Sequence, residues 1–376
     1  MAGGIAQKRN FFGSWIFIVL PIVFLSSLGI LILISAGAGR PDPYAFARKQ
    51  AVWLALAYCA GIFTAFVDIG LLKKISVPLA AISILLLILT LVPQIGKSVN
   101  GARRWLEIGP AVIQPSDLAK FAIVLFLSSY LHSKQRRIDS LLYGFLIPFG
   151  VLGTFCALII LEPDFGTTFL CGIVGASLIF LSGAKLRYIA PAGALAAAGF
   201  CVLIYLNPVR FQRIISFLDF EANKSGGAYQ LYQALLAFGT GGVTGVGIGQ
   251  GRQQLFFLPE AHTDFIFAIV GEELGLIFTS IVCLMFFILF ISAIISLHRA
   301  PNLYEFNLAA GAMLMIIIQA LFNMCVVTGL APTKGISLPF LSYGGSNLVT
   351  MFAFSGLLLN CVRSWNKPTL IKSSEL

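Results

Sequence analysis

The chain has 376 residues, of which 58% are hydrophobic and 11% are charged, and its formal net charge at pH 7 is +10. A soluble domain carries about 25% charged residues, so this composition excludes an ordinary soluble enzyme and predicts a membrane protein. The basic balance fits cytoplasmic loops better than nucleic-acid binding, and we expect no nucleic-acid partner.

Apolar windows of about 20 residues predict ten membrane-spanning helices. The first run, Phe11 to Ala36, is longer than the ~7–15 residues of a signal-peptide core and is expected to be retained. The windows lie near residues 14–36, 50–70, 75–94, 112–131, 141–161, 166–184, 187–206, 265–297, 304–329 and 340–362. The prediction is an all-α polytopic membrane protein, with residues 1–376 as a single domain.

The loops on the two sides of this bundle differ in charge. Each short loop on the side of the N-terminus is basic and nearly free of acids, as at Lys73 and Lys74. Such loops are typical of the cytoplasm, and an even number of spans places both termini there. The outer loops carry balanced charges in short motifs, so we expect the chemistry on the outer face.

The longest outer loop covers residues 207–263, between the seventh and eighth predicted spans. Its start has an apolar set at helical spacing with two arginines between its members, which favours a helix lying in the membrane interface. The apolar residues are Phe211, Ile214, Ile215 and Leu218, and the arginines are Arg210 and Arg213. The stretch from Tyr229 to Gly251 is apolar and then rich in glycine. It is interpreted as ordered and re-entrant, the alternative being a flexible surface loop.

Two motifs before and within the fourth span carry basic groups. Arg103 and Arg104 stand beside Trp105, a combination that suits a phosphate or sugar; a lipid-headgroup anchor explains it equally well. Asp117 and Lys120 lie three residues apart, on one helix face in the outer half of the membrane. A structural ion pair is at least as good an interpretation as a direct catalytic role.

Three further outer or intramembrane motifs have open alternatives. Glu162 and Asp164 flank Pro163 in a tight turn, where they can neutralise basic groups, bind a cation or cap a helix. Gln319 and Asn323 share a helix face and are expected to bond across to a neighbouring helix. Lys334 is the one charge of the last outer loop, either an anion ligand or a snorkelling lysine.

The densest polar stretch is QQLFFLPEAHTDFIFAIVGEELG, residues 253–275. Asp264 is either an N-cap, together with Thr263, or a functional carboxylate. On a straight helix Glu272 is rotated by about 80° and Glu273 by about 180° from Asp264. Glu273 is then expected to pair with another helix, while Asp264 faces the outer cavity.

These motifs predict a site for an anionic, lipid-linked polar substrate. Basic groups would hold its phosphates, and a carboxylate would act as general base on a hydroxyl. The seven cysteines form no CxxC pair and lie in apolar runs or at their ends, so neither a disulfide nor a zinc site is expected.

The motifs LPEAHTDFIFAIVGEELG, SVNGARRW, QPSDLAK, EPDFGT and LPFLSYGGSN resemble those of the SEDS family of bacterial cell-wall proteins. The loop PTKGISLPFLSYGGS is most similar to the FtsW division branch, with the RodA elongation branch as the alternative. The resemblance implies a ten-helix peptidoglycan glycosyltransferase that polymerises lipid II on the outer face of the bacterial cytoplasmic membrane, at the septum. It also implies a class B penicillin-binding protein and other divisome membrane proteins as partners.

The resemblance assigns roles to individual residues. Asp264 matches the essential aspartate of the family and would deprotonate the acceptor hydroxyl. The residues assigned to substrate binding are Arg103, Arg104, Lys120, Lys334, His262 and Glu260. The residues assigned to support are Asp117, Glu162, Asp164, Glu272 and Glu273. Asp117 is a departure, since the family more often has glutamate there.

Two questions stay open in the sequence. No metal ligands are assigned, but a divalent cation, Mg²⁺ or Mn²⁺, at the pyrophosphate is an open expectation, with no other cofactor. The rival functions are a lipid II flippase and a non-catalytic scaffold. A transporter should carry polar groups through the inner half of the membrane, where this sequence has few.

Overall fold

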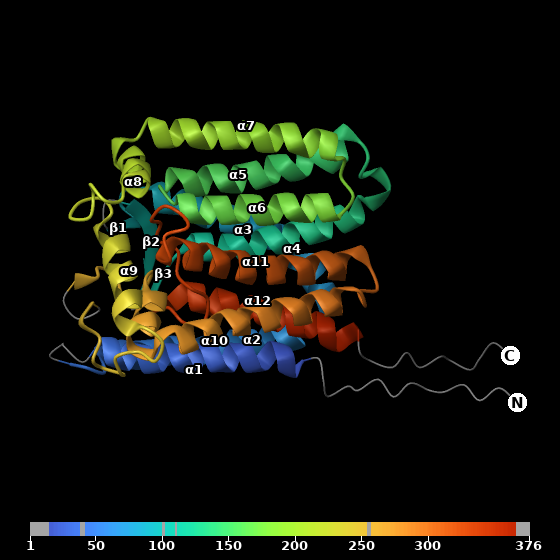
Figure 1. The fold of residues 1–376 in the computed structure, drawn as a ribbon. Coiled ribbons are helices and arrows are strands. Elements are labelled where there is room, and N and C mark those ends of the chain that lie inside the picture. The colour runs from blue at the N-terminus through green and yellow to red at the C-terminus, as the bar shows by residue number, and fades with distance from the viewer. Residues whose placement is uncertain (1–14, 38–41, 100–101, 110, 254–256, 366–376) are drawn as a thin grey trace, which may run out of the picture.

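The computed structural model describes residues 15–37, 42–99, 102–109, 111–253 and 257–365. Ten long helices run side by side as a bundle (Figure 1). They are α1 (Ile16–Ala36), α2 (Ala45–Phe66), α3 (Ile69–Leu91), α4 (Pro115–Ser133), α5 (Ile147–Leu161), α6 (Phe165–Leu181), α7 (Leu186–Tyr205), α10 (Ile266–Leu297), α11 (Leu303–Val327) and α12 (Gly345–Trp365). The start of α1 and the end of α12 lie at the same end of the bundle, as predicted for the two termini.

The structure confirms a polytopic α-helical membrane protein. Eight of its described helices are long and apolar enough to cross a membrane. The two other predicted spans are α6, an apolar helix of 17 residues, and α4, which carries the polar pair Asp117 and Lys120. Both lie within the bundle beside the other helices (Figure 1), and the count of ten spans stays a prediction.

The boundary between the second and third spans lies earlier in the chain than predicted. Helix α3 begins at Ile69 because the side chain of Asp68 caps it, accepting bonds from the amides of Gly70 and Leu71 at 3.2 and 3.1 Å. Lys73 and Lys74, expected in a loop, therefore lie in the first turns of α3. At the same end of the bundle a 3₁₀ turn, η1 (Gln135–Arg137), follows α4, and a π-helical turn, η2 (Leu142–Leu146), leads into α5.

The described part of the long outer loop forms helices and defined turns, which removes the flexible-loop alternative there, while its expected dip into the membrane stays a prediction. It forms α8 (Pro208–Leu218) and α9 (Tyr229–Gly241), which cross one end of the bundle (Figure 1). Helix α9 packs against α10, where the rings of Phe238 and Phe267 lie 5.7 Å apart. The exposed side chains of Phe211, Ile215 and Leu218 give α8 the apolar face that an interfacial helix needs.

A small three-stranded antiparallel sheet, which the sequence did not predict, lies at the same end of the bundle. Its strands are β1 (Gly96–Val99), β2 (Ala102–Ile108) and β3 (Ala111–Ile113), in that order. The register between β1 and β2 shifts between Lys97 and Ser98, which leaves Arg104 opposite no residue of β1. Arg104 is half-buried, whereas Arg103 is exposed. Strands this short carry too few residues for a clear alternating pattern.

Helix α10 is not the straight helix that the sequence analysis assumed. Gly275 has φ 72° and ψ −169° and breaks the helix, a conformation that is essentially restricted to glycine. The carbonyls of Gly242 and Val243 accept bonds from the amides of Leu276 and Ile277 at 2.9 and 3.3 Å. The glycine-rich loop thus replaces the helical partners that the break removes.

Candidate active site

Asp264 lies at the outer end of the bundle, just before the first turn of α10. Its main-chain carbonyl accepts a bond from Nδ2 of Asn323 at 2.7 Å, and the same amide donates to the carbonyl of Ile336 at 2.6 Å. Asn323 of α11 therefore ties the Asp264 segment to the last outer loop. The helix begins after Phe265 without a side-chain cap, and Thr263 bonds back to Glu260, so the N-cap alternative is wrong.

The Asp264 carboxyl is half-buried, and its surroundings disfavour the charge. Burial raises its pKa to about 7, and the neighbouring Glu260 and Asp164 raise it while Arg104 lowers it. Gly335 packs against the Asp264 carboxyl and must be small, because a Cβ on Gly335 would lie 2.7 Å from Oδ2 of Asp264. A carboxylate whose pKa lies near neutrality suits a general base.

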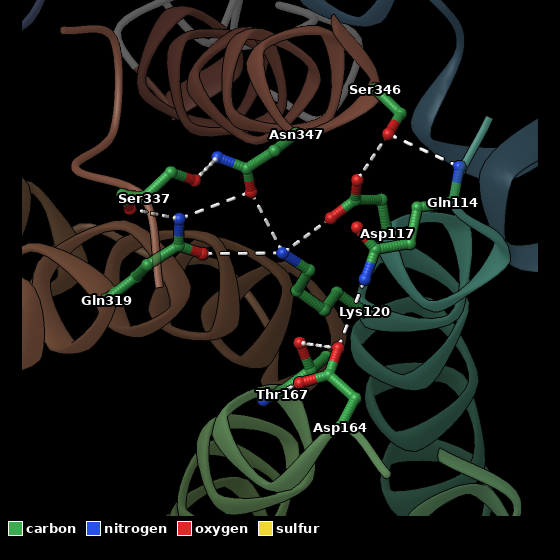
Figure 2. Close-up of polar contacts among 9 residues, drawn as sticks. All are labelled: Gln114, Asp117, Lys120, Asp164, Thr167, Gln319, Ser337, Ser346 and Asn347. Atoms are coloured by element: carbon green, nitrogen blue, oxygen red, sulfur yellow. Dashed lines mark hydrogen bonds and ion pairs between the residues drawn. The ribbon is translucent and has the colours of Figure 1, made fainter. Parts of the chain in front are cut away.

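Lys120 is the centre of a buried network (Figure 2). Its ammonium group contacts Oδ1 of Asp117 at 2.7 Å and donates to the amide oxygens of Asn347 at 2.9 Å and Gln319 at 3.4 Å. Ser346 donates to the other oxygen of Asp117 at 2.6 Å. All three donors of Lys120 are thus directed at protein oxygens, as in a structural ion pair that joins α4, α11 and α12.

The turn between α5 and α6 borders this network. Asp164 caps α6, accepting bonds from the amide and hydroxyl of Thr167 at 3.2 and 2.8 Å, and it also accepts from Gln114 at 3.1 Å (Figure 2). Glu162 is fully buried and accepts a bond from Thr90, and burial raises its pKa to about 8. Arg104 donates to the carbonyls of Glu162 at 2.9 Å and Pro163 at 2.7 Å, so this arginine holds the turn.

Two cations lie against the ring of Phe165, next to this turn. The guanidinium carbon of Arg210 lies 3.7 Å and Nζ of Lys334 4.5 Å from the centre of the Phe165 ring. Burial lowers the pKa of Lys334 to about 8, as do Arg213, Arg210 and Arg104, while Asp164 opposes this. Burial, Arg104 and Arg213 also lower the pKa of Arg210.

We call Arg104, Arg210, Arg213 and Lys334 the basic cluster. Within the described parts of the chain, none of the four forms an ion pair with a carboxylate. Cations that lower one another's pKa, with no carboxylate in ion-pair contact among the described residues, are a ready site for an anion. Arg104 also affects the pKa of Asp264, so the anion and the base would be neighbours.

Comparison with known proteins identifies the family. The model of the FtsW/RodA/SpoVE family, described as cell cycle proteins, matches residues 8–367. This chain belongs to the FtsW/RodA/SpoVE family. A relative in Coxiella burnetii, named probable peptidoglycan glycosyltransferase FtsW, is 40% identical over 365 residues, covering 94% of this chain and 98% of its own.

Two solved structures share the fold with this member of the FtsW/RodA/SpoVE family. A chain of a peptidoglycan synthase complex, described as coordinating polymerization and crosslinking, has a TM-score of 0.77 at 26% identity; the match covers 93% of this chain and 98% of that one. The rod shape determining protein RodA of Thermus thermophilus has a TM-score of 0.70 at 25% identity, with 96% and 100% covered.

Three of the predicted substrate-binding residues lie outside the basic cluster. Arg103 is exposed on β2. The His262 ring lies between Phe46 and Tyr343, at 4.4 and 5.7 Å. Glu260 is exposed, with a left-handed φ of 51°.

The paired glutamates of the family motif brace the glycine-rich loop. Glu272 accepts bonds from the amides of Arg252 and Gln253 at 2.7 and 3.0 Å. Glu273 accepts from the amide of Gly249 at 3.0 Å and from Ser35 of α1 at 2.5 Å. The expected pairing of Glu273 with another helix is confirmed, and both carboxylates stabilise the break in α10.

Arg210 and Arg213 are the site residues that the sequence analysis missed. They were assigned only to the surface of an interfacial helix, although their spacing of three along α8 places both on one side. No group of three or more His, Cys, Asp or Glu side chains in the described ranges could hold a metal ion. The divalent cation expected at the pyrophosphate therefore has no site made by these side chains alone and enters no step below.

Proposed function

We propose that this protein is a peptidoglycan glycosyltransferase that polymerises lipid II on the outer face of the bacterial cytoplasmic membrane. The observation that carries the proposal is a half-buried carboxylate with a pKa of about 7, beside four cations that have no carboxylate partner in the described chain. The names of relatives in the same family support the activity.

The geometry supports a single-base mechanism. Asp264 takes the proton of the acceptor's sugar 4-hydroxyl as its oxygen attacks the anomeric carbon of the donor. The bond from that carbon to the pyrophosphate breaks, and the polyprenyl pyrophosphate leaves with the electron pair. Attack opposite the leaving group inverts the anomeric centre. The basic cluster stabilises the charge that develops on the leaving pyrophosphate.

The cluster belongs to the donor and not to the acceptor. Only the donor's pyrophosphate is bonded to the reacting carbon, whereas the acceptor's own pyrophosphate is a disaccharide away from the attacking hydroxyl. Arg104 lowers the pKa of both Asp264 and Lys334. This supports placing the donor's pyrophosphate on the basic cluster, next to Asp264. The buried network of Lys120 joins α4, α11 and α12 and reaches Ser337 of the last outer loop (Figure 2).

The relatives support a proposal for the partner and the place. The similar chain in a synthase complex that coordinates polymerization and crosslinking supports a transpeptidase partner of the penicillin-binding class. Relatives named FtsW and stage V sporulation protein E support a role in division, at the septum of the cytoplasmic membrane.

The test is polymerisation of lipid II by the purified protein with its transpeptidase partner. We expect Asp264→Asn to lower kcat by roughly 10²–10⁴-fold, the usual contribution of a general base. Asp219→Asn, which changes an exposed aspartate of the same outer loop, is the matched control and should keep full activity. Undiminished glycan synthesis by Asp264→Asn would refute the assignment.

A further inference from the structure

A cavity of about 630 Å³ opens between α8 and the turn that leads into α9. Pockets of roughly 300–1,000 Å³ hold small-molecule ligands. Its polar lining comes from Gln212 and Arg213 of α8, Tyr229 and Gln230 of α9, and Thr333 of the last outer loop. The mechanism proposed above leaves this cavity without a role.

The cavity faces the polar side of α8. At about 100° per residue, Gln212 and Arg213 lie on a different side of the helix from Phe211, Ile215 and Leu218. The latter three are exposed and form the apolar face expected to meet lipid. The turn at Gly227 packs close to α8, because a Cβ on this glycine would lie 2.3 Å from Oγ of Ser216. The lining combines these polar groups with Pro208, Val209, Gly226 and Gly227, so the cavity suits a peptide, which carries both polar and apolar groups.

The cavity adjoins the basic cluster. Arg213 lines the cavity and also lowers the pKa of Lys334 and of Arg210, so it is their neighbour. Thr333 lines the cavity and directly precedes Lys334. A group in the cavity is thus adjacent to a pyrophosphate on the cluster. In lipid II, the sugar bonded to the pyrophosphate is the one that carries the peptide.

The lining suits a peptide that carries carboxylates. Within the described chain, the side chains of Gln212, Tyr229, Gln230 and Thr333 make no hydrogen bond to other residues. Side-chain amides and hydroxyls can form hydrogen bonds with both the N–H and the C=O groups of a peptide, and an arginine can bind its carboxylate. No acidic side chain lines the cavity to repel that charge.

We propose that this cavity binds the acidic stem peptide of the donor substrate and makes the enzyme select its donor by that peptide. The proposal rests on the proposed function, because it takes the basic cluster as the donor's pyrophosphate site. It assigns Gln212, Tyr229 and Gln230 to substrate selection and not to the chemical step.

The test compares two substrates that differ only in the peptide: lipid II with its full stem peptide, and the same lipid-linked disaccharide without a peptide. Wild type is expected to show a kcat/KM at least about tenfold higher for the peptide-bearing substrate. In the variant Gln212→Ala/Gln230→Ala, the ratio of kcat/KM for the two substrates should fall about tenfold, because the variant loses two hydrogen bonds to the peptide. The loss should appear in KM, with kcat and the rate on the peptide-free substrate unchanged.

Tyr229→Phe keeps the shape of the cavity and should lose a smaller part of the same preference. Ser225→Ala, in the same turn but outside the lining, is the control and should behave as wild type. Equal effects of the double variant on both substrates, no effect on either, or a wild type that does not discriminate would each overturn the proposal. A wild type that polymerises neither substrate would instead contradict the proposed function.

Discussion

At the scale of single residues, Asp264 and Lys334 have pKa values on either side of the working pH. Burial raises that of Asp264 to about 7 and lowers that of Lys334 to about 8. A base must be deprotonated and an anion ligand protonated, so activity requires a pH above the first value and below the second. The pH dependence of kcat/KM reports such groups in the free enzyme.

We therefore expect a bell-shaped profile of kcat/KM with its maximum between about pH 7 and 8. Lys334→Arg should remove the descending limb, because arginine stays charged. Glu260→Gln should move the ascending limb to lower pH, because the Glu260 charge raises the pKa of Asp264. An ascending limb that does not move in Glu260→Gln would contradict the assignment of this limb to Asp264.

Asn323 acts on the site through Asp264 and is a positioning residue. Its amide donates to the carbonyls of Asp264 and Ile336. Asn323→Ala should lower kcat with KM nearly unchanged, and should destabilise the protein by about 1–3 kcal/mol, the usual cost of an unpaired buried group. Asn223→Ala removes a comparable bond, to the carbonyl of Asp219 at the surface, and should leave kcat unchanged. Kinetics on purified protein and thermal unfolding check both effects.

At the scale of elements, variants of the Asp117–Lys120 pair distinguish a structural role of Lys120 from a role in binding the substrate. Lys120→Met leaves a buried carboxylate unpaired, which costs about 3–5 kcal/mol, and we expect a fall in the thermal midpoint and in activity. Asp117→Asn/Lys120→Met removes both charges and should restore the midpoint. If the double variant regains activity, Lys120 stabilises the bundle; if it folds but stays inactive, Lys120 also serves the substrate.

The break in α10 depends on a single glycine. Gly275→Ala forces a side chain into a glycine-only conformation and places its Cβ 2.4 Å from backbone atoms of Val243 and Gly245. We expect a loss of at least about 1–3 kcal/mol of stability, seen as a lower thermal midpoint. Gly153→Ala, in α5 with no atom within 4 Å of the added Cβ, should be neutral or stabilising.

At the scale of the whole molecule, long apolar stretches could be predicted and short polar contacts could not. The predicted windows end within a few residues of most helices because about 20 apolar residues are needed to cross a bilayer. The sheet at β1–β3 was missed because its strands are short, and the break in α10 because Gly275 is compatible with an uninterrupted helix. The place of Asp264 at the outer end could be predicted. The approach of Arg210 and Arg213 to Lys334 could not, since it depends on how α8 crosses the bundle.

The glycine break in α10 has a mechanical consequence for an enzyme that works on a lipid. The part from Leu276 to Leu297 is roughly 33 Å long at 1.5 Å per residue, enough to cross the hydrocarbon layer. Ile266 to Leu274, which follows Asp264, is held by the loops and by α11. The break at Gly275 therefore lets the short part that follows Asp264 take its direction from the loops and α11, while the long part takes the direction needed to cross the membrane.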